Sequence, residues 1–217
     1  MKRERRGRRA FLKASLTTAA GAAWAARATH TAAQDASPAP AGPPRIKFAA
    51  IGLNHGHING QVESVKRGGG VLVSFYAKEP DLVAAFSKRF PEARLVGRER
   101  EILEDPQVQL VVSASIPDER APLGLRVMRA GKDFMVDKPG ITTLAQLAEV
   151  KKVQAETRKI YSILYSERLE NRATVKAGEL VKAGAIGKVL QTVGLGPHRM
   201  NPKTRPAWFF ERERYGG

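Results

Sequence analysis

Three short polar stretches of the sequence each follow an apolar run and contain side chains with chemical uses: 55–57, 115–118 and 137–139. In the third stretch, Lys138 comes directly after the apolar run 134–136. A lysine at the end of a buried strand can have its pKa lowered by desolvation, as a group that relays protons requires. Lys138 is therefore the predicted catalytic residue. The alternative is a solvated lysine that precedes the turn residue Pro139.

The first stretch contains two histidines, His55 and His57, at the point where a helical spacing begins. Paired imidazoles are common metal ligands, but no carboxylate or third histidine lies near them in the sequence. We therefore predict no metal site. We expect one histidine to lie near the phosphates of a nucleotide and the other to pack.

The elements that position these side chains begin with residues 46–51, an apolar run without polar alternation that is typical of a strand covered on both faces. A turn with Gly52 follows, and helical spacing starts at Ile58. Strand, glycine turn and helix form the opening unit of a dinucleotide-binding fold, whose helix N-terminus binds phosphate.

The glycine pattern of this turn is imperfect. Its three glycine places hold Gly52, Asn54 and His57, and Gly56 lies one place early. Asparagine tolerates positive φ, so Asn54 can hold the turn. A histidine where a small residue normally lets helix and strand pack closely is harder to explain, so the pattern alone is weak.

The next strand is predicted over 71–76, and an acid about 20 residues after the glycines would bind the ribose hydroxyls of NAD. That place falls on Ala77, followed by Lys78 and Glu79. A missing acid beside a lysine favours a 2′-phosphate, and so weakly favours NADP over NAD. The alternative is an exposed loop lysine.

Helical and apolar segments alternate through the rest of this half. We predict helices over 81–90, 99–103, 121–130 and 144–158, and strands over 95–96, 108–114, 134–136 and 160–164. This alternation indicates an α/β fold with a Rossmann-like, doubly wound parallel sheet. Ligands of such sheets bind at the carboxyl ends of the strands, where 115–118 and 137–139 lie.

Several motifs together resemble the glucose–fructose oxidoreductase / inositol dehydrogenase / MocA (Gfo/Idh/MocA) family over about residues 46–217. They are Ser115-Ile116-Pro117-Asp118 after a strand, Ala130-Gly131-Lys132, Asp137-Lys138-Pro139, Tyr165-Ser166-Glu167-Arg168 and Gly184-Ala185-Ile186-Gly187-Lys188-Val189. Two positions depart from the family pattern: Asp137 replaces its usual Glu, and Asp118 its usual Asn.

The resemblance implies an oxidoreductase that uses NAD or NADP on a sugar, cyclitol or polyol, with Lys138 reaching both nicotinamide and substrate. Some members of the family use the cofactor for glycoside cleavage instead. The residues predicted to contact the cofactor are Gly52, Asn54, His55, Gly56, His57, Lys78, Ser115, Pro117, Asp137, Lys138 and Arg168. His198 is a candidate substrate contact. Arg199, Asn201 and Arg205 follow in the same loop, which could face the substrate. A surface position is the alternative for Arg168 and for this whole loop, His198 included.

Residues 46–164 are predicted to form the nucleotide-binding domain, and 165–217 the start of an incomplete α+β substrate domain. A helix over 174–183 and a strand from Gly187 through Val193 are expected there. In the family, an Asp-x-x-x-His segment and most of an oligomerising sheet follow Gly216-Gly217, so we expect a fragment or a shortened gene product. The alternative function is a non-catalytic nucleotide- or sugar-binding module.

Residues 1–33 resemble a twin-arginine (Tat) export signal, with Arg8-Arg9-Ala10-Phe11-Leu12-Lys13, a mildly apolar run and small residues at Thr31-Ala32-Ala33. The resemblance implies passage through the Tat translocase to the periplasm or beyond. The alternative is a basic tail. The apolar run is too short and weak for a stable membrane anchor. Residues 34–45 are a Pro/Ala linker.

The formal charge of +16 does not indicate nucleic-acid binding once it is divided along the chain. Residues 1–33 carry a net +7, and the remaining +9 is interleaved with acids and forms no array of basic and aromatic residues. The excess can attract anionic cofactors or substrates. The sequence has no cysteine, which excludes disulfides and thiolate chemistry.

Overall fold

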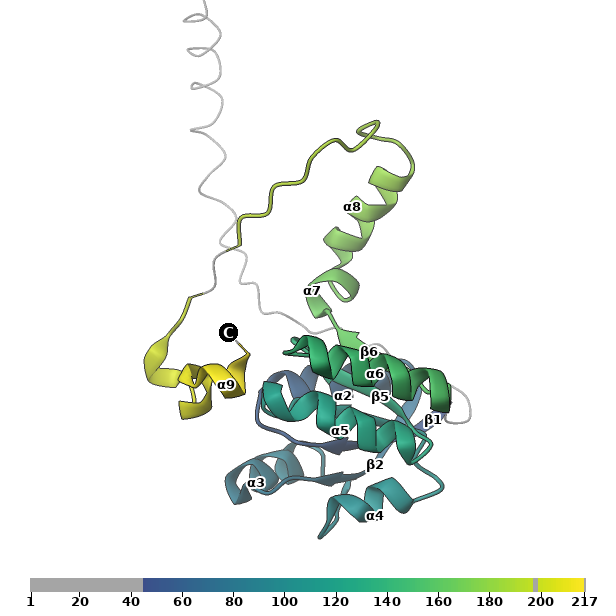
Figure 1. The fold of residues 1–217 in the computed structure, drawn as a ribbon, viewed down its shortest axis with the longest axis vertical. Helices are drawn as coiled ribbons and strands as arrows, with labels where there is room; N and C mark the ends of the chain where they lie inside the picture. Colours follow the sequence, from purple (N-terminus) through teal and green to yellow (C-terminus); the bar gives the residue numbers. More distant parts are fainter. Residues whose placement is uncertain (1–44, 197–198, 217) are drawn as a thin grey trace, which may run out of the picture. The chain divides into compact units, whose positions relative to one another are not determined.

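The computed structural model describes residues 45–196 and 199–216 (Figure 1). The predicted export signal, nearly all of the linker and His198 lie outside this range. None of the helices in the described range is long and apolar enough to cross a membrane.

A six-stranded, wholly parallel sheet forms the centre of the fold, in the order β3-β2-β1-β4-β5-β6. The predicted doubly wound α/β sheet is confirmed. Each predicted strand of this half is present, with bounds that differ by at most two residues. The strands are β1 Ile46–Ile51, β2 Gly70–Tyr76, β3 Arg94–Leu95, β4 Leu110–Ser113, β5 Asp133–Asp137 and β6 Tyr161–Leu164.

Helices alternate with these strands: α2 His57–Arg67, α3 Pro80–Arg89, α4 Glu99–Glu104, α5 Pro117–Arg129 and α6 Leu144–Thr157. After β6 come α7 Ser166–Leu169, α8 Arg172–Lys182, the 3₁₀ turns η1 Pro202–Thr204 and η2 Ala207–Phe210, and α9 Arg212–Tyr215. Helix α5 begins four residues before the predicted start at Ala121. The reason is Pro117, whose fixed φ and missing N–H suit the first turn of a helix.

Alternate residues of the strands face two separate apolar layers. Phe48 and Ala50 of β1 pack with α2 and α3, whereas Ala49 and Ile51 pack with α4 and α5. Helix α6 lies beside α5 (Figure 1) and extends the second layer. Because both faces are covered, the strands consist of continuous apolar runs, as their sequence predicted.

The order of the strands reverses between β1 and β4, which are neighbours at the centre of the sheet. The chain leaves β1 toward one face of the sheet and β4 toward the other, so the loops that follow these two strands diverge. This opens a crevice at the place where doubly wound sheets bind ligands.

The strand predicted from Gly187 through Val193 is wrong for this structure: residues 188–196 form no helix or strand. Val189, Leu190 and Val193 are exposed, and no described strand lies alongside to accept their backbone hydrogen bonds.

The chain then returns to the nucleotide-binding half. Trp208 is buried, and Arg214 lies 3.9 Å from Asp118 and 3.5 Å from Glu119 at the start of α5. Residues 199–216 therefore form a wall over the carboxyl edge of the sheet, and we call this segment the C-terminal wall.

Candidate active site

The turn after β1 depends on Gly52. Its φ is +77°, and a Cβ at this position would lie 2.6 Å from Cβ of Ser115, which follows β4. The amide of His55 donates to the carbonyl of Ala114 at 3.0 Å and ties the turn to the same segment. Glycine at 52 is thus required both by the backbone angle and by the close approach.

The turn leaves room at the amino end of α2. Gly56 occupies the N-cap without a side-chain hydrogen bond, and apart from its chain neighbours no atom lies within 4 Å of where its Cβ would be. The first N–H groups of the helix bond within the turn: those of His57, Ile58 and Asn59 donate to Nδ1 of His55 (3.4 Å) and to the carbonyls of His55 (3.1 Å) and Gly56 (3.3 Å). The helix dipole adds partial positive charge there, which favours a phosphate, and the cofactor contacts of Gly52 and Gly56 stay predictions.

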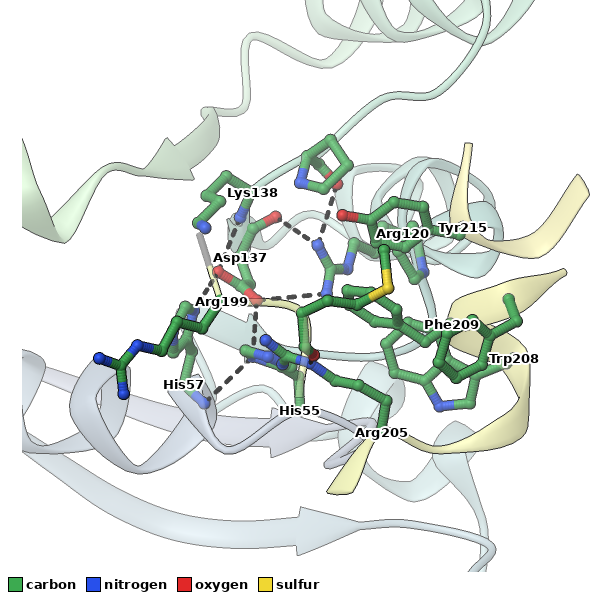
Figure 2. Close-up of a pocket in the computed structure, with 14 residues that line it drawn as sticks. His55, His57, Arg120, Asp137, Lys138, Arg199, Arg205, Trp208, Phe209 and Tyr215 are labelled. Carbon is green, nitrogen blue, oxygen red and sulfur yellow. Dashed lines mark hydrogen bonds and ion pairs between the residues drawn. The ribbon is translucent and has the colours of Figure 1, made fainter. Parts of the chain in front are cut away.

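Two clefts flank the turn, of ≈ 400 and ≈ 410 Å³. The first cleft lies between the end of β5 and the C-terminal wall (Figure 2) and includes His55, His57 and Lys138. The second lies beyond Gly52, at the end of β2. A dinucleotide has two nucleoside halves joined by a pyrophosphate, so two clefts on either side of a phosphate-binding turn fit an NAD-type cofactor.

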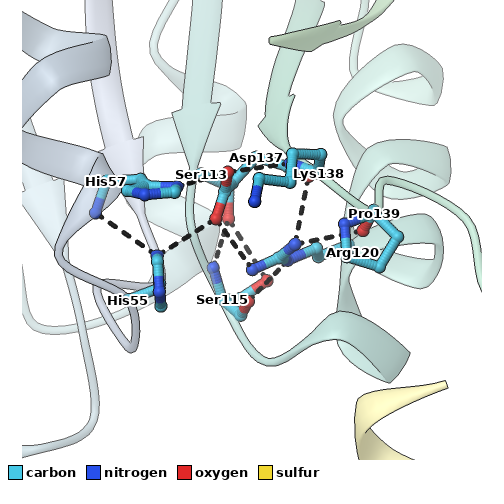
Figure 3. Close-up of polar contacts among 8 residues, drawn as sticks. All are labelled: His55, His57, Ser113, Ser115, Arg120, Asp137, Lys138 and Pro139. Atoms are coloured by element: carbon cyan, nitrogen blue, oxygen red, sulfur yellow. Dashed lines mark hydrogen bonds and ion pairs between the residues drawn. The ribbon is translucent and has the colours of Figure 1, made fainter. Parts of the chain in front are cut away.

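Asp137, the last residue of β5, organises the first cleft although it is only 3% exposed. Its Oδ1 lies 2.9 Å from Nδ1 of His57 and accepts from the amide of Lys138 at 2.8 Å. Its Oδ2 lies 3.2 Å from Nδ1 of His55 and accepts from Nη2 of Arg120 at 3.2 Å (Figure 3). Both carboxylate oxygens are thus fully used, and the predicted contact of Asp137 with the cofactor stays a prediction.

Arg120 of α5 is buried beneath this carboxylate at 1% exposure. It donates to the carbonyls of Ser115 (2.7 Å), Asp137 (3.1 Å) and Pro139 (3.0 Å), besides its bond to the carboxylate. Burial lowers the pKa of the guanidinium, which the charge of Asp137 opposes. One side chain therefore joins the ends of β4 and β5 at the site.

The pKa of Asp137 reflects opposing influences. Burial would raise the pKa, but hydrogen bonds with His55 and His57 and the positive charge of Arg120 outweigh it. The pKa of the carboxyl group lies well below its usual range as a result. Asp137 is ionised at neutral pH and holds the groups around it in place.

Sequence reasoning missed Arg120 and a second buried polar residue, Gln61 of α2. With its amide turned to satisfy both partners, Gln61 donates to the carbonyl of Ser113 at 3.0 Å and accepts from the amide of Asp137 at 2.8 Å. A signal for both was present: each falls at helical spacing among buried apolar residues of its helix. A buried polar side chain requires partners, and strand ends supply them.

Lys138 lies at the first cleft, as predicted, and is half-buried. Its backbone is fixed by the bond from its amide to Asp137, and within residues 45–196 and 199–216 no acid forms an ion pair with its ammonium group. The group is therefore available to a bound substrate or cofactor.

The two histidines meet a carboxylate that is distant in sequence. Ligand atoms of His55, His57 and Asp137 lie within 4.8 Å of one another, a grouping that could hold a metal ion. The prediction of no metal rested on the lack of a nearby carboxylate, which the fold supplies. Two observations still disfavour a metal: both oxygens of Asp137 have partners, and the Arg120 cation is already 3.2 Å from one of them.

The arrangement favours acid–base chemistry instead. An ionised carboxylate only accepts, so His57 contacts Asp137 as its Nδ1–H tautomer. In this neutral tautomer Nε2 carries the ring's free lone pair, and 43% of the side chain is exposed. An imidazole that a buried carboxylate orients in this way is able to accept a proton from a neighbouring hydroxyl group.

The second cleft brings Asn54, Lys78 and Glu79 together. The amide of Asn54 donates to Oε1 of Glu79 at 2.8 Å, which fastens the turn to the end of β2. A carboxylate therefore lines this cleft two residues after Ala77, the place where the spacing put a ribose-binding acid. Lys78 remains a predicted contact, now beside a carboxylate.

The remaining residues that were predicted to contact the cofactor or the substrate do not all lie at the two clefts. Ser115 is buried and lines the second cleft, and Pro117 opens α5 and lines the first. Arg168 is exposed on α7 with its guanidinium 3.5 Å from where a Cβ of Gly178 would lie, and it borders neither cleft. Its contact with the cofactor stays a prediction, as does the substrate contact of His198.

A family assignment follows from comparison with known proteins. The sequence profile of the Gfo/Idh/MocA oxidoreductase family, described as having an NAD-binding Rossmann fold, matches residues 46–165, more than half of the chain. The chain belongs to this family, and its sheet with the two clefts is an NAD-binding Rossmann fold.

Individual relatives support this family assignment. A crystal structure from Erwinia carotovora atroseptica SCRI1043, provisionally classed as an oxidoreductase, has 39% identity and a TM-score of 0.77 over 80% of this chain and 52% of that one. Levoglucosan dehydrogenase of Pseudarthrobacter phenanthrenivorans is 26% identical over 61% of this chain and 34% of its own.

A solved levoglucosan dehydrogenase in complex with NADH shares the fold at a TM-score of 0.64 and 19% identity, over 79% of this chain and 48% of that chain. The chain spans about a third of the length of the curated relatives that it matches and about half of these two structures.

Proposed function

We propose that the protein is an exported NAD(P)-dependent oxidoreductase that transfers a hydride between the nicotinamide and a sugar, cyclitol or polyol. One observation carries the proposal: the glycine turn after β1 joins two clefts, and one of them holds Lys138 and His57 beside the buried Asp137. The bound cofactor supplies the hydride-accepting ring.

The residues of this chain supply the rest. Asn54, Lys78 and Glu79 would face the adenosine half, and the amino end of α2 the phosphates. Lys138 would donate a hydrogen bond to the hydroxyl oxygen that is oxidised, and the hydroxyl proton would pass to Nε2 of His57, the imidazole that Asp137 orients. The charge of an ammonium group stabilises a developing alkoxide, which makes the loss of that proton easier.

The substrate class is supported by chemistry and by the relatives. The first cleft combines aromatic rings with several hydrogen-bond donors, a combination suited to a hydroxylated ring. A relative named for levoglucosan, an anhydrosugar, points to the same class.

Export is proposed from the sequence of residues 1–33 alone. The test is to express the full chain in a bacterium with an active twin-arginine pathway and to fractionate the cells. Replacement of Arg8 and Arg9 by lysines should leave the protein in the cytoplasm. An unchanged distribution would remove export from the proposal.

The catalytic claim is tested by turnover of the chain with NAD⁺ and NADP⁺ on a panel of sugars, cyclitols and polyols. Lys138→Met should lower kcat by about 100-fold or more, the scale of a lost acid–base group, while cofactor affinity changes little. Lys152→Met, at an exposed position of α6, is the matched control. Cofactor binding without turnover on any substrate would favour the non-catalytic binding module.

A further inference from the structure

The first cleft carries an unbalanced positive charge. Its cationic side chains are Arg120, Lys138, Arg199 and Arg205, and its one acid is Asp137. Asp137 is buried and already bound to Arg120. Lys138, Arg199 and Arg205 therefore leave an excess of three positive charges on a cleft of ≈ 400 Å³.

Comparable arginines near the cleft are paired. Arg126 of α5 lies 2.7 Å from Glu99, and Arg214 lies 3.5 Å from Glu119. By contrast, no described carboxylate lies within ion-pair distance of Arg199 or Arg205. Arg199 and Arg205 are thus cations without an ion-pair partner, and they line the cleft where a substrate would bind.

Arg205 is held in place rather than freely solvated. Its Nε donates to the carbonyl of Met200 at 3.0 Å, and its guanidinium stacks 4.6 Å from the centre of the Phe209 ring. The side chain is half-buried, and its terminal nitrogens have no described protein acceptor. A guanidinium fixed by stacking loses little entropy when it binds a carboxylate with two hydrogen bonds.

The C-terminal wall also offers apolar surface beside these cations. Trp208 is buried, and its ring centre lies 5.8 Å from that of Phe209, which lies 4.4 Å from the ring centre of Tyr215 (Figure 2). Ion pairs from Arg214 to Asp118 and Glu119 fasten the wall to α5. Aromatic faces of this kind stack against the apolar face of a sugar ring, while the cations hold a charged end.

We propose that the substrate is an acidic sugar, an aldonate or uronate, whose carboxylate binds Arg205 with help from Arg199, and whose reacting hydroxyl lies toward Lys138. This inference rests on the proposed function and narrows its substrate class. The two arginines could instead bind the phosphates of the cofactor, whose oxygens are negatively charged like those of a carboxylate. The turn after β1, at the positive end of the α2 dipole, offers those phosphates a separate place.

The test is calorimetric titration of the chain, saturated with NADH, with D-gluconate, D-glucuronate and D-glucose. At least one acid should bind ten-fold or more tightly than glucose, and the difference should shrink as salt is raised. Arg205→Gln should abolish the difference, and Arg205→Lys should restore part of it. Arg100→Gln, an exposed arginine paired to Glu104 that borders neither cleft, is the control and should leave it intact.

Three results would overturn the proposal. The first is equal binding of acids and glucose, and the second is an Arg205→Gln variant that keeps the preference. The third is a loss of NADH affinity in that variant as large as the loss of acid binding, which would assign Arg205 to the cofactor. If the chain turns over neutral polyols but binds no acid, this inference alone is contradicted, and the proposed function stands.

Discussion

Replacement of Arg120 by methionine is the strongest test of how the site is held together. The change keeps an unbranched side chain, although a shorter one, but removes the cation from buried Asp137 and three donors from strand-end carbonyls. Breaking a buried ion pair from one side costs about 3–5 kcal/mol, because the remaining charge is left uncompensated. For a domain of this size, each kcal/mol corresponds to roughly 2–4 °C in Tm, so Tm should fall by roughly 6–20 °C.

The assay is urea unfolding followed by circular dichroism, together with a thermal scan. Arg126→Met is the matched control on the same helix: its pair with Glu99 is partly exposed, and its loss should cost at most about 1 kcal/mol. A loss from Arg120→Met no larger than that of the control would refute the claim that Arg120 and Asp137 join the strand ends.

Three further predictions concern the same framework. The lowered pKa of Asp137 means that its stabilisation of the fold is present above the unfolded-state pKa of about 3.9 and is lost as the pH falls through the folded pKa. The difference in the free energy of unfolding between the parent and Asp137→Asn should therefore be widest at neutral pH and close on acidification. A difference that is independent of pH in urea titrations would contradict this. Gly52→Ala should destabilise by about 2–5 kcal/mol, from its positive φ and the 2.6 Å approach to Ser115, and a melting scan that shows no loss would contradict the turn geometry. Glu79→Gln should raise the affinity for NADPH relative to NADH by about ten-fold, because the Glu79 carboxylate and a 2′-phosphate ~8 Å away would repel by roughly 1–2 kcal/mol. Lys78→Gln should lower the same ratio. Calorimetry with both cofactors measures it, and unchanged ratios would remove both residues from cofactor selection.

Much of the fold could be predicted from local sequence. The strands around β1 and β4 are apolar runs of the right length, Gly52 ends the first of them, and the helices between them have periodic apolar faces. These signals are local, because a buried strand and an amphipathic helix record their surroundings in their own residues. The position of Lys138 at the carboxyl edge follows from the same pattern.

The network around Asp137 could not be predicted in this way. Its partners His57 and Arg120 are 80 and 17 residues away, and only the pairing of parallel strands brings them to one edge. Sequence reasoning therefore judged the histidines by their neighbours and found no carboxylate. The strand expected from Gly187 fails for a similar reason, since a strand forms only where another edge accepts its hydrogen bonds.

The measurement closest to the central claim is the binding of NADH and NADPH to the purified chain by calorimetry, with Gly52→Val as the variant that fills the turn. The claim is that the two clefts beside Gly52 hold one nicotinamide dinucleotide. One cofactor per chain should bind with a rise in Tm, and Gly52→Val should weaken binding by ten-fold or more at a temperature where the variant is folded. Absence of binding by both cofactors, or full affinity in the variant, would contradict the account.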